Sequence, residues 1–230
     1  MSFLYIVATP IGNLEDITFR AIRILNEVDF ILCEDTRVSK KLLDHYKIET
    51  PTISYHEHST DKKIDYIINL LEEGKNLSLI TDAGTPGISD PGGKLIQKVL
   101  EKTKENNVKI EAIPGPSAIT AALSISGINI SKFVFFGFPP HKNKRKKFIK
   151  KILESEFPAV VYESKHRIIK FLEEIRKDSK ETNKTLNYLI VLRELSKKHE
   201  TIYRGDIDDI INKIKNNPYS QKGEFVIILS

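Results

Sequence analysis

Five segments in the first half of the chain follow directly after short apolar runs, and together they hold most of the glycine and proline of that half and a cluster of acidic side chains. They are 9–13 (TPIGN), 34–37 (EDTR), 56–58 (HEH), 82–92 (DAGTPGISDPG) and 114–117 (PGPS). Carboxylates can accept protons, and turns rich in glycine let a ligand approach free backbone N–H and C=O groups. Glycine and proline can also serve only to turn the chain, but 82–92 and 114–117 each carry several of them. The segments therefore predict a ligand site built from rigid turns.

The apolar runs before these segments predict buried β-strands, and amphipathic helices separate them. We expect strands over 4–8, 30–33, 52–55, 77–81 and 109–113. Helices are expected after Asp16, which would cap the first of them, through 41–43, and over 62–73, 93–106 and 117–125. Alternating strands and helices predict a mostly parallel sheet with helices on both faces, so that the five segments meet at its carboxyl edge.

The pattern restarts after residues 127–131, which we interpret as the joint between two α/β domains, 1–127 and 128–230. We expect strands over 133–137, 159–163, 188–193, 201–204 and 225–229, and helices over 144–153, 167–177 and 207–216. Some of these strands follow one another without a helix between them, which predicts a mixed sheet. The charged stretch 177–184 is expected to be a mobile connection.

The composition is that of an ordinary folded protein with a mildly basic balance. The 230 residues carry a formal net charge of +5, with 40% hydrophobic and 29% charged residues, which permits a polyanionic partner without proving one. The single cysteine, Cys33, gives no reason to expect an oxidising compartment. The first residues lack a basic stretch, and no apolar run approaches the roughly 20 residues of a membrane span, so we expect a cytoplasmic protein with no membrane association.

Two common nucleotide-binding fingerprints are absent from the chain. Neither G-x-G-x-x-G nor G-x-x-x-x-G-K-[ST] occurs, which argues against a nicotinamide dehydrogenase and against an ATPase of the P-loop type. The segment His56-Glu57-His58 offers two imidazoles, but no third ligand is evident. We therefore predict no metal site.

A basic segment lies at 139–151, where lysine and arginine dominate. Such a segment is often only a solvated helix start, but its charge density favours contacts to phosphates. The candidate contacts to such phosphates are Arg37, Lys142, Lys144, Arg145, Lys146, Lys147, Lys165, Arg167 and Lys197.

Several motifs together resemble one known family. They are LYIVATPIGNLEDIT, EDTR, LITDAGTPGISDPG, IPGPSA, FFGFPP, YESKHR, LRELSKKHETIYRG and KGEFVII, in this order, between Leu4 and Ile228. The chain resembles the ribosomal RNA small subunit methyltransferase I family, a branch of the tetrapyrrole methylase superfamily. Ala8 departs from the proline usual at that position, and we expect little consequence because it lies at a strand end.

The resemblance implies two α/β domains with S-adenosylmethionine bound in the cleft between them, and 2′-O-methylation of a cytidine in the decoding region of small-subunit ribosomal RNA, as naked RNA or in the 30S subunit. It also implies a homodimer, and it makes the candidate phosphate contacts RNA contacts, with recognition of folded RNA more than of a base-by-base code. The implied cofactor contacts are Pro10, Ile11, Asp82, Ala83, Gly84, Thr85, Ile88, Ser117, Ala118, Tyr162, Leu192 and Gly223.

Methyl transfer to a hydroxyl needs an acceptor held in line with the donor and a group that takes the proton. The candidate bases are the carboxylates Glu34, Asp35, Asp82, Glu163 and Glu194. Asp82 and Glu163 are preferred because each directly ends a predicted strand, and Arg193 could steer a phosphate. Any of these carboxylates could instead be structural, since Arg37 and Arg193 are close enough in sequence to pair with Asp35 and Glu194.

Two other functions remain open from the sequence. One is methylation of a tetrapyrrole carbon, against which the basic segment argues. The other is binding of RNA without catalysis, against which the glycine- and proline-rich turns argue.

Overall fold

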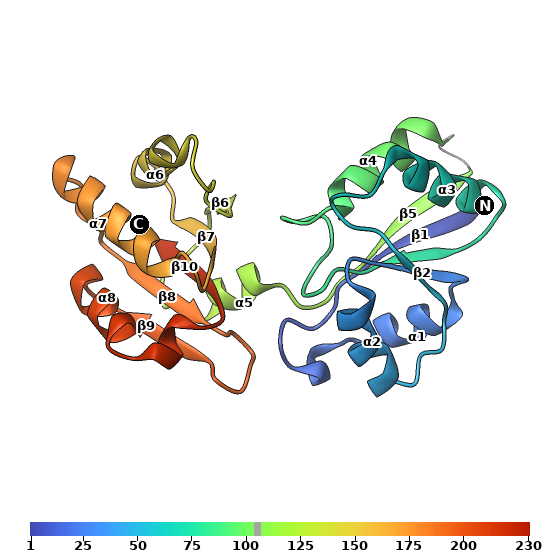
Figure 1. Ribbon diagram of the computed structural model, residues 1–230, viewed down its shortest axis with the longest axis horizontal. Coiled ribbons are helices and arrows are strands. Elements are labelled where there is room, and N and C mark those ends of the chain that lie inside the picture. Colours follow the sequence, from blue (N-terminus) through green and yellow to red (C-terminus); the bar gives the residue numbers. More distant parts are fainter. Residues whose placement is uncertain (104–106) are drawn as a thin grey trace. The chain divides into compact units, whose positions relative to one another are not determined.

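The computed structural model describes residues 1–103 and 107–230, and the chain divides into two compact units, Met1–Ser117 and Ala118–Ser230 (Figure 1). The boundary predicted from the sequence, after residue 127, lies further along the chain. The difference is helix α5 (Ala118–Ser124), which contacts strand β10 (Glu224–Leu229) and so belongs to the second unit.

The first unit contains a parallel sheet with the strand order β3-β2-β4-β1-β5. The strands are β1 (Ser2–Val7), β2 (Phe30–Cys33), β3 (Thr52–Ser54), β4 (Leu77–Leu79) and β5 (Val108–Ile113). All five carboxyl ends therefore lie at one edge of the sheet. The predicted parallel sheet is confirmed.

Helices cover both faces of this sheet (Figure 1). They are η1 (Leu14–Asp16), α1 (Phe19–Glu27), α2 (Thr36–His45), α3 (Asp61–Glu72) and α4 (Gly92–Lys102). Alternate strand residues point to opposite faces, so Leu4 and Leu32 pack with α3 and α4, whereas Val7 and Ile31 pack with α1 and α2. The end of the predicted helix 93–106 falls on residues 104–106, outside the described residues.

The predicted cap of the first helix is wrong. Helix α1 begins after Thr18, whose hydroxyl accepts a hydrogen bond from the Ala21 amide at 3.1 Å. Asp16 lies earlier, in the 3-10 turn η1, which Asn13 caps through the Glu15 amide. Aspartate and threonine are both common helix caps, and here it is the Thr18 side chain that bonds to the free Ala21 amide of the first turn.

The second unit contains a mixed sheet with the order β6-β7-β10-β8-β9, as predicted. Its further strands are β6 (Val134–Gly137), β7 (Ala159–Ser164), β8 (Leu189–Arg193) and β9 (Thr201–Arg204). Only the pair β6–β7 is parallel among the pairings of this sheet in the described residues. Its further helices are α6 (Arg145–Leu153), α7 (Ile168–Glu181), α8 (Ile207–Lys215) and η2 (Pro218–Gln221).

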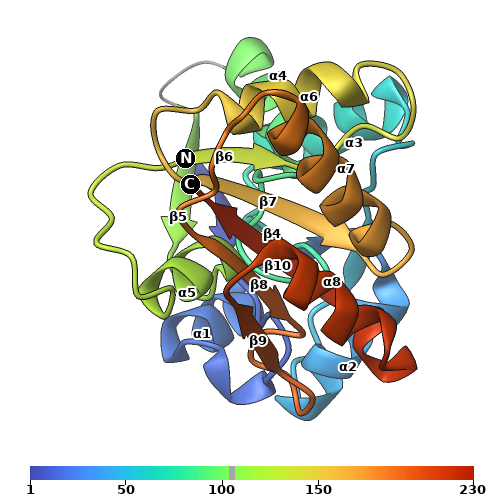
Figure 2. The same cartoon turned by 90° about the vertical axis from the view of Figure 1, so that its left-hand side faces the viewer.

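Helices α6, α7 and α8 cover one face of the second sheet (Figures 1 and 2). Phe171 of α7 and Ile210 of α8 are completely buried against Val161, Val191 and Ile227 of the strands. The burial of this single apolar layer stabilises the unit and leaves the opposite face of the sheet to α5.

The expected mobile connection at 177–184 is wrong, because α7 continues to Glu181. Its polar end is held by neighbours: Ser179 is buried, and Arg176 and Lys180 both form ion pairs with Asp208 of α8, at 2.5 and 3.4 Å. The charged residues are the solvent-facing side of a helix whose buried side continues through Ser179.

Candidate active site

The loops after β1 and β4 are joined directly at the carboxyl edge of the first sheet. Thr9 and Gly84 exchange backbone hydrogen bonds of 2.9 and 3.1 Å, and the Thr9 hydroxyl donates to the Thr81 carbonyl at 3.1 Å. Pro10 and Ile11, which follow Thr9, are buried. The prediction that the strand-end segments gather at one edge is confirmed for these two loops.

The loop after β5 joins the same junction. The Thr85 hydroxyl donates to the Pro116 carbonyl at 3.0 Å. Gly84 has a φ of +85°, and a side chain there would touch Ile11 and Pro116. At Gly115 a Cβ would lie 3.0 Å from the Cβ of Ala8, so that this glycine lets two loops approach closely. The glycines therefore serve the packing of the edge.

Two carboxylates from neighbouring loops face this edge. The half-buried Glu34 accepts a hydrogen bond from the Thr81 hydroxyl at 3.0 Å, and the exposed Asp82 accepts one from the Asp35 amide at 3.1 Å. Burial raises the pKa of Glu34, the Thr81 bond lowers it, and the negative charges of Asp82 and Asp90 raise it again. A net negative potential at this edge favours a cationic ligand.

Asp35 has a structural role in the same region. Its carboxylate caps α2 through the Arg37 amide at 2.8 Å and pairs with the Arg37 guanidinium at 2.6 Å. The hydrogen bonds from Arg37 lower the pKa of Asp35 to about 2. Asp35 is thus ionised and paired with Arg37, which agrees with the alternative that it is a structural carboxylate. The side chain of Arg37 is 88% exposed.

The predicted cofactor contacts of the first unit fit a donor of mixed character. Asp82 and Ala83 are exposed, Thr85 and Ser117 are half-buried, and Ile88 is 43% exposed. An exposed carboxylate next to an apolar side chain and glycine turns suits S-adenosylmethionine, which combines cationic groups with an apolar and hydrogen-bonding nucleoside.

Two of the cofactor positions predicted in the second unit, Tyr162 and Leu192, lie on the sheet face opposite to α6–α8. In the strand register Tyr162, Val226 and Leu192 form one row across β7, β10 and β8. Tyr162 forms a hydrogen bond with the backbone of Ile119 in α5, which Ala118 begins. Burial is the main cause that raises the pKa of Tyr162, to about 12, so this hydroxyl stays protonated and can donate a hydrogen bond.

Two predicted catalytic residues lie on the other face, under the helices. Glu163 and Arg193 flank Phe225 in the adjoining row of the register. The Glu163 side chain is completely buried and pairs with Arg167 at 2.8 Å and Arg145 at 3.8 Å. Burial raises its pKa, although both arginines and the Ser164 amide act in the opposite direction. This is the environment of a structural carboxylate and not of a base that meets substrate.

Three of the predicted phosphate-binding arginines donate to their own chain. Arg193 donates to the carbonyls of Lys222 at 2.6 Å and His199 at 2.9 Å. Arg145, only 6% exposed, donates to Glu174 at 2.6 Å and to the Pro140 carbonyl, and Arg167 donates to the Pro139 carbonyl. Their burial argues against direct contact with RNA. By contrast, the candidate lysines of the basic segment, Lys142, Lys144, Lys146 and Lys147, are exposed, and so is Lys165 after β7.

A family model described as tetrapyrrole (corrin/porphyrin) methylases matches residues 3–211. The chain belongs to the tetrapyrrole methylase family. Several relatives bear the name ribosomal RNA small subunit methyltransferase I. That of Hydrogenobaculum sp. is 44% identical, covering 99% of this chain and 95% of the relative. That of Mycoplasmopsis pulmonis is 43% identical (99% and 97%), and that of Thermotoga maritima 38% (100% and 99%).

Solved structures of tetrapyrrole methylases share the fold. Cobalt precorrin-4 methyltransferase CbiF has a TM-score of 0.68 over 98% of this chain and 94% of that protein, and the methyltransferase CobJ has 0.70 over 100% and 94%. Both are 16% identical to this chain, so the likeness concerns the fold alone. The predictions of a methyltransferase, of its fold class and of S-adenosylmethionine as methyl donor are confirmed by this membership.

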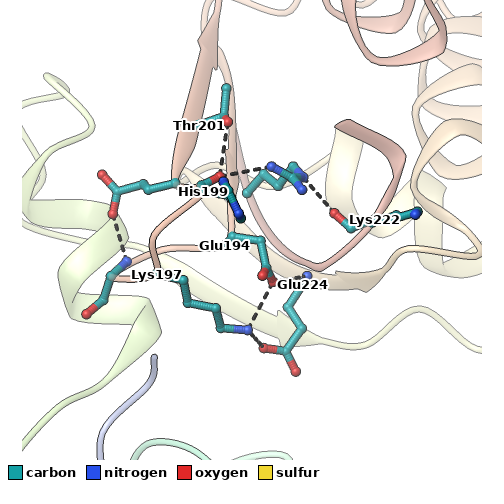
Figure 3. Close-up of polar contacts among 9 residues, drawn as sticks. Glu194, Lys197, His199, Thr201, Lys222 and Glu224 are labelled. Carbon is teal, nitrogen blue, oxygen red and sulfur yellow. Dashed lines mark hydrogen bonds and ion pairs between the residues drawn. The ribbon is translucent and has the colours of Figure 1, made fainter. Parts of the chain in front are cut away.

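In this methylase the loop between β8 and β9 is tightly fixed (Figure 3). Lys197 lies between two carboxylates, 3.0 Å from Glu194 and 2.7 Å from Glu224, and Glu194 also accepts from the Glu224 amide at 2.9 Å. Glu194 itself has a φ of +51°, and Gly223 packs directly against its carboxyl group. Gly223 was predicted to contact the cofactor and Lys197 to contact RNA, and in the structure both contact Glu194.

Sequence patterns missed a residue that helps to build this site. Thr81, which connects the loops of the first unit through Thr9 and Glu34, was not singled out, and only its position at the end of an apolar run signals it. Among the described residues no group of three or more histidine, cysteine or acidic side chains could hold a metal ion. Nor does any helix in residues 1–103 and 107–230 have the length and apolar character for a membrane span.

Proposed function

We propose that the protein transfers the methyl group of S-adenosylmethionine to the 2′-hydroxyl of a cytidine in the decoding region of small-subunit ribosomal RNA. The observation that carries the proposal is the near-full-length identity of 38–44% with ribosomal RNA small subunit methyltransferases I. The carboxylate-rich edge of the first sheet supports it, because a cationic donor is favoured there.

When bound, the donor supplies a sulfonium leaving group and a methyl carbon open to in-line attack. The cofactor contacts of the first unit are Pro10, Ile11, Asp82, Ala83, Gly84, Thr85, Ile88 and Ser117. Ala118, Tyr162, Leu192 and Gly223 contribute from the second unit, where the protonated Tyr162 hydroxyl is a donor. The rigid turns orient the donor, which is worth several kcal/mol of the barrier when the reacting atoms are aligned.

Asp82 accepts the proton of the ribose hydroxyl in this proposal. It is exposed and lies in the loop after β4, whereas Glu163 is buried under the helices of the second unit. Glu34 remains a neighbour that holds the Thr81 hydroxyl. The exposed lysines of the basic segment, with Arg37, contact RNA phosphates, and the arginines Arg145, Arg167 and Arg193 support that segment and the β8–β9 loop from within.

The test is a methyl-transfer assay with labelled S-adenosylmethionine and small ribosomal subunits or their naked RNA. Label is expected in 2′-O-methylcytidine after digestion to nucleosides. Label in a base-methylated nucleoside would refute the proposal, and methylation of a precorrin would instead support the alternative of a tetrapyrrole substrate. Calorimetry that detects no donor binding would favour an RNA-binding protein without catalysis.

We also propose a cytoplasmic homodimer, since ribosomal subunits are the substrate and paired subunits are common in this superfamily. Light scattering at working concentration is expected to give twice the chain mass. A monomer would contradict the dimer, and recovery with a membrane fraction would contradict the location.

A further inference from the structure

We propose that Phe138 is a stacking platform for an unpaired nucleobase of the RNA substrate. The inference rests on the proposed function and adds a residue that touches the substrate. It combines an exposed and supported aromatic ring, a β-bulge that places the ring, and a row of exposed lysines that begins four residues later.

A β-bulge in strand β6 determines which way Phe138 points. Phe135 pairs with Val160 of β7, but Gly137 pairs with Val161, so two steps along β6 match one step along β7. Without this shift, alternation would place Phe138 with Phe136, on the face covered by α6–α8. With it, Phe138 falls on the same face as Phe135 and Tyr162, and Gly137 takes a φ of +69°. Bulges of this kind re-aim side chains near functional sites.

The re-aimed ring is supported by two others. Phe138 lies against Tyr162 with ring centroids 5.4 Å apart, and Tyr162 lies edge-on to Phe135 at 5.0 Å. Tyr162 is itself anchored to the backbone of Ile119. Phe138 nevertheless remains 50% exposed. An apolar ring that is held on one side and open on the other can receive a flat, apolar surface.

The backbone beyond the ring is fixed by buried charges. Arg167 donates to the Pro139 carbonyl at 2.9 Å and Arg145 to the Pro140 carbonyl at 3.2 Å, and Glu163 pairs with both arginines. The ring therefore keeps its direction at little entropic cost on binding.

The basic segment next to Phe138 indicates which kind of ligand stacks on the ring. Lys142, Lys144, Lys146 and Lys147 are exposed along the chain that leaves Phe138. Lysines bind the phosphates of a nucleic acid, and exposed aromatic rings stack with its unpaired bases, so together they fit a splayed nucleotide. A base held beside Tyr162, one of the proposed cofactor contacts, would bring its ribose toward the donor.

The first test measures methyl transfer to small ribosomal subunits by Phe138→Ala, Phe138→Trp and Phe133→Ala. Phe133 is a matched control, since it is 42% exposed and precedes the opposite end of β6. Phe138→Ala is expected to raise KM for the subunits by about 5- to 150-fold, the usual effect of losing one stacked base. Phe138→Trp, which keeps a large aromatic ring, is expected to keep KM for the subunits near the wild-type value, and Phe133→Ala to leave it unchanged.

The second test uses fluorescence, because the chain has no tryptophan. In Phe138→Trp a cytidine oligonucleotide is expected to quench the emission of the new indole by stacking on it. In Phe133→Trp the same oligonucleotide is expected to leave the emission unchanged. Equal quenching in both variants would overturn the proposal.

Calorimetry with S-adenosylmethionine alone separates the possible failures. Phe138→Ala is expected to bind the donor with the wild-type Kd, which also shows that it is folded. A KM for subunits within about twofold of wild type in Phe138→Ala, well below the effect of one stacked base, would overturn the stacking role. A loss of donor affinity in place of RNA affinity would overturn it as well. A wild-type protein that binds the donor but never methylates RNA would instead overturn the proposed function.

Discussion

Replacement of Gly223 by alanine is expected to destabilise the second unit strongly, because the glycine packs against a fixed carboxylate. Gly223 has a φ of +101°, and a Cβ there would lie 2.5 Å from the Cγ, Cδ and Oε1 atoms of Glu194. The backbone conformation alone costs an L-residue about 1–3 kcal/mol.

The carboxylate of Glu194 would have to move away from the new methyl group. It would then lose the hydrogen bond from the Glu224 amide at 2.9 Å and the pair with Lys197 at 3.0 Å (Figure 3). A hydrogen bond to a charged group contributes about 1.5–3 kcal/mol, so its loss and the backbone cost together give about 2.5–6 kcal/mol. The assay is urea unfolding followed by circular dichroism.

Gly205→Ala is the matched control, since Gly205 also has a positive φ, +121°, but no atom within 4 Å of its Cβ position. It is expected to cost only the backbone contribution. Adding Glu194→Ala to Gly223→Ala removes the clashing atoms, so the two costs should not add. If Gly223→Ala costs no more than Gly205→Ala, or if the double variant is additive, the packing argument is refuted.

Three further predictions concern charge. Burial acts to raise the pKa of Glu194, but the Glu224 amide and Lys197 outweigh it and lower the pKa below its ordinary value of 4.5. Wild type should therefore be more stable than Glu194→Gln above pH 4.5. In urea titrations this difference in stability should vanish as the pH falls through the lowered pKa. A difference in stability between wild type and Glu194→Gln that grows as the pH falls would contradict this prediction. Asp82→Asn should lower kcat about 10²- to 10⁴-fold at saturating donor if Asp82 takes the proton, and an unchanged kcat would leave it a binding residue only. The double variant Lys146→Ala/Lys147→Ala should weaken RNA binding and reduce the slope of log Kd against log salt by about 0.7–0.9 for each phosphate that the variant no longer neutralises, whereas an unchanged slope would place both lysines outside the interface.

Much of the first unit follows from its sequence. Its apolar runs alternate with segments of helical periodicity, and the carboxyl ends of parallel strands lie at one edge. The sequence therefore predicts that the loops after β1 and β4 meet, as the Thr9–Gly84 junction shows. The capping position was not, because Asp16 and Thr18 are both good caps and only the path of the chain through η1 selects Thr18.

The second unit shows where sequence patterns fail. The run Ala159–Ser164 is apolar on both faces, so periodicity could not tell that Glu163 faces the helices and Tyr162 the opposite side. The bulge before Gly137 reverses the direction of Phe138, and nothing in the letters FFGF fixes the residue at which alternation shifts. Arg145 and Arg167 look like phosphate ligands in the sequence, but the structure shows that they donate to backbone carbonyls.

Alkaline hydrolysis of the methylated RNA tests the central claim most directly. Alkali cleaves RNA through the 2′-hydroxyl, so a methyl group on that oxygen protects the adjacent bond. After transfer from labelled S-adenosylmethionine to small ribosomal subunits, the label is expected in an alkali-stable dinucleotide that begins with cytidine. Label that is released entirely in mononucleotides would contradict a ribose methyltransferase.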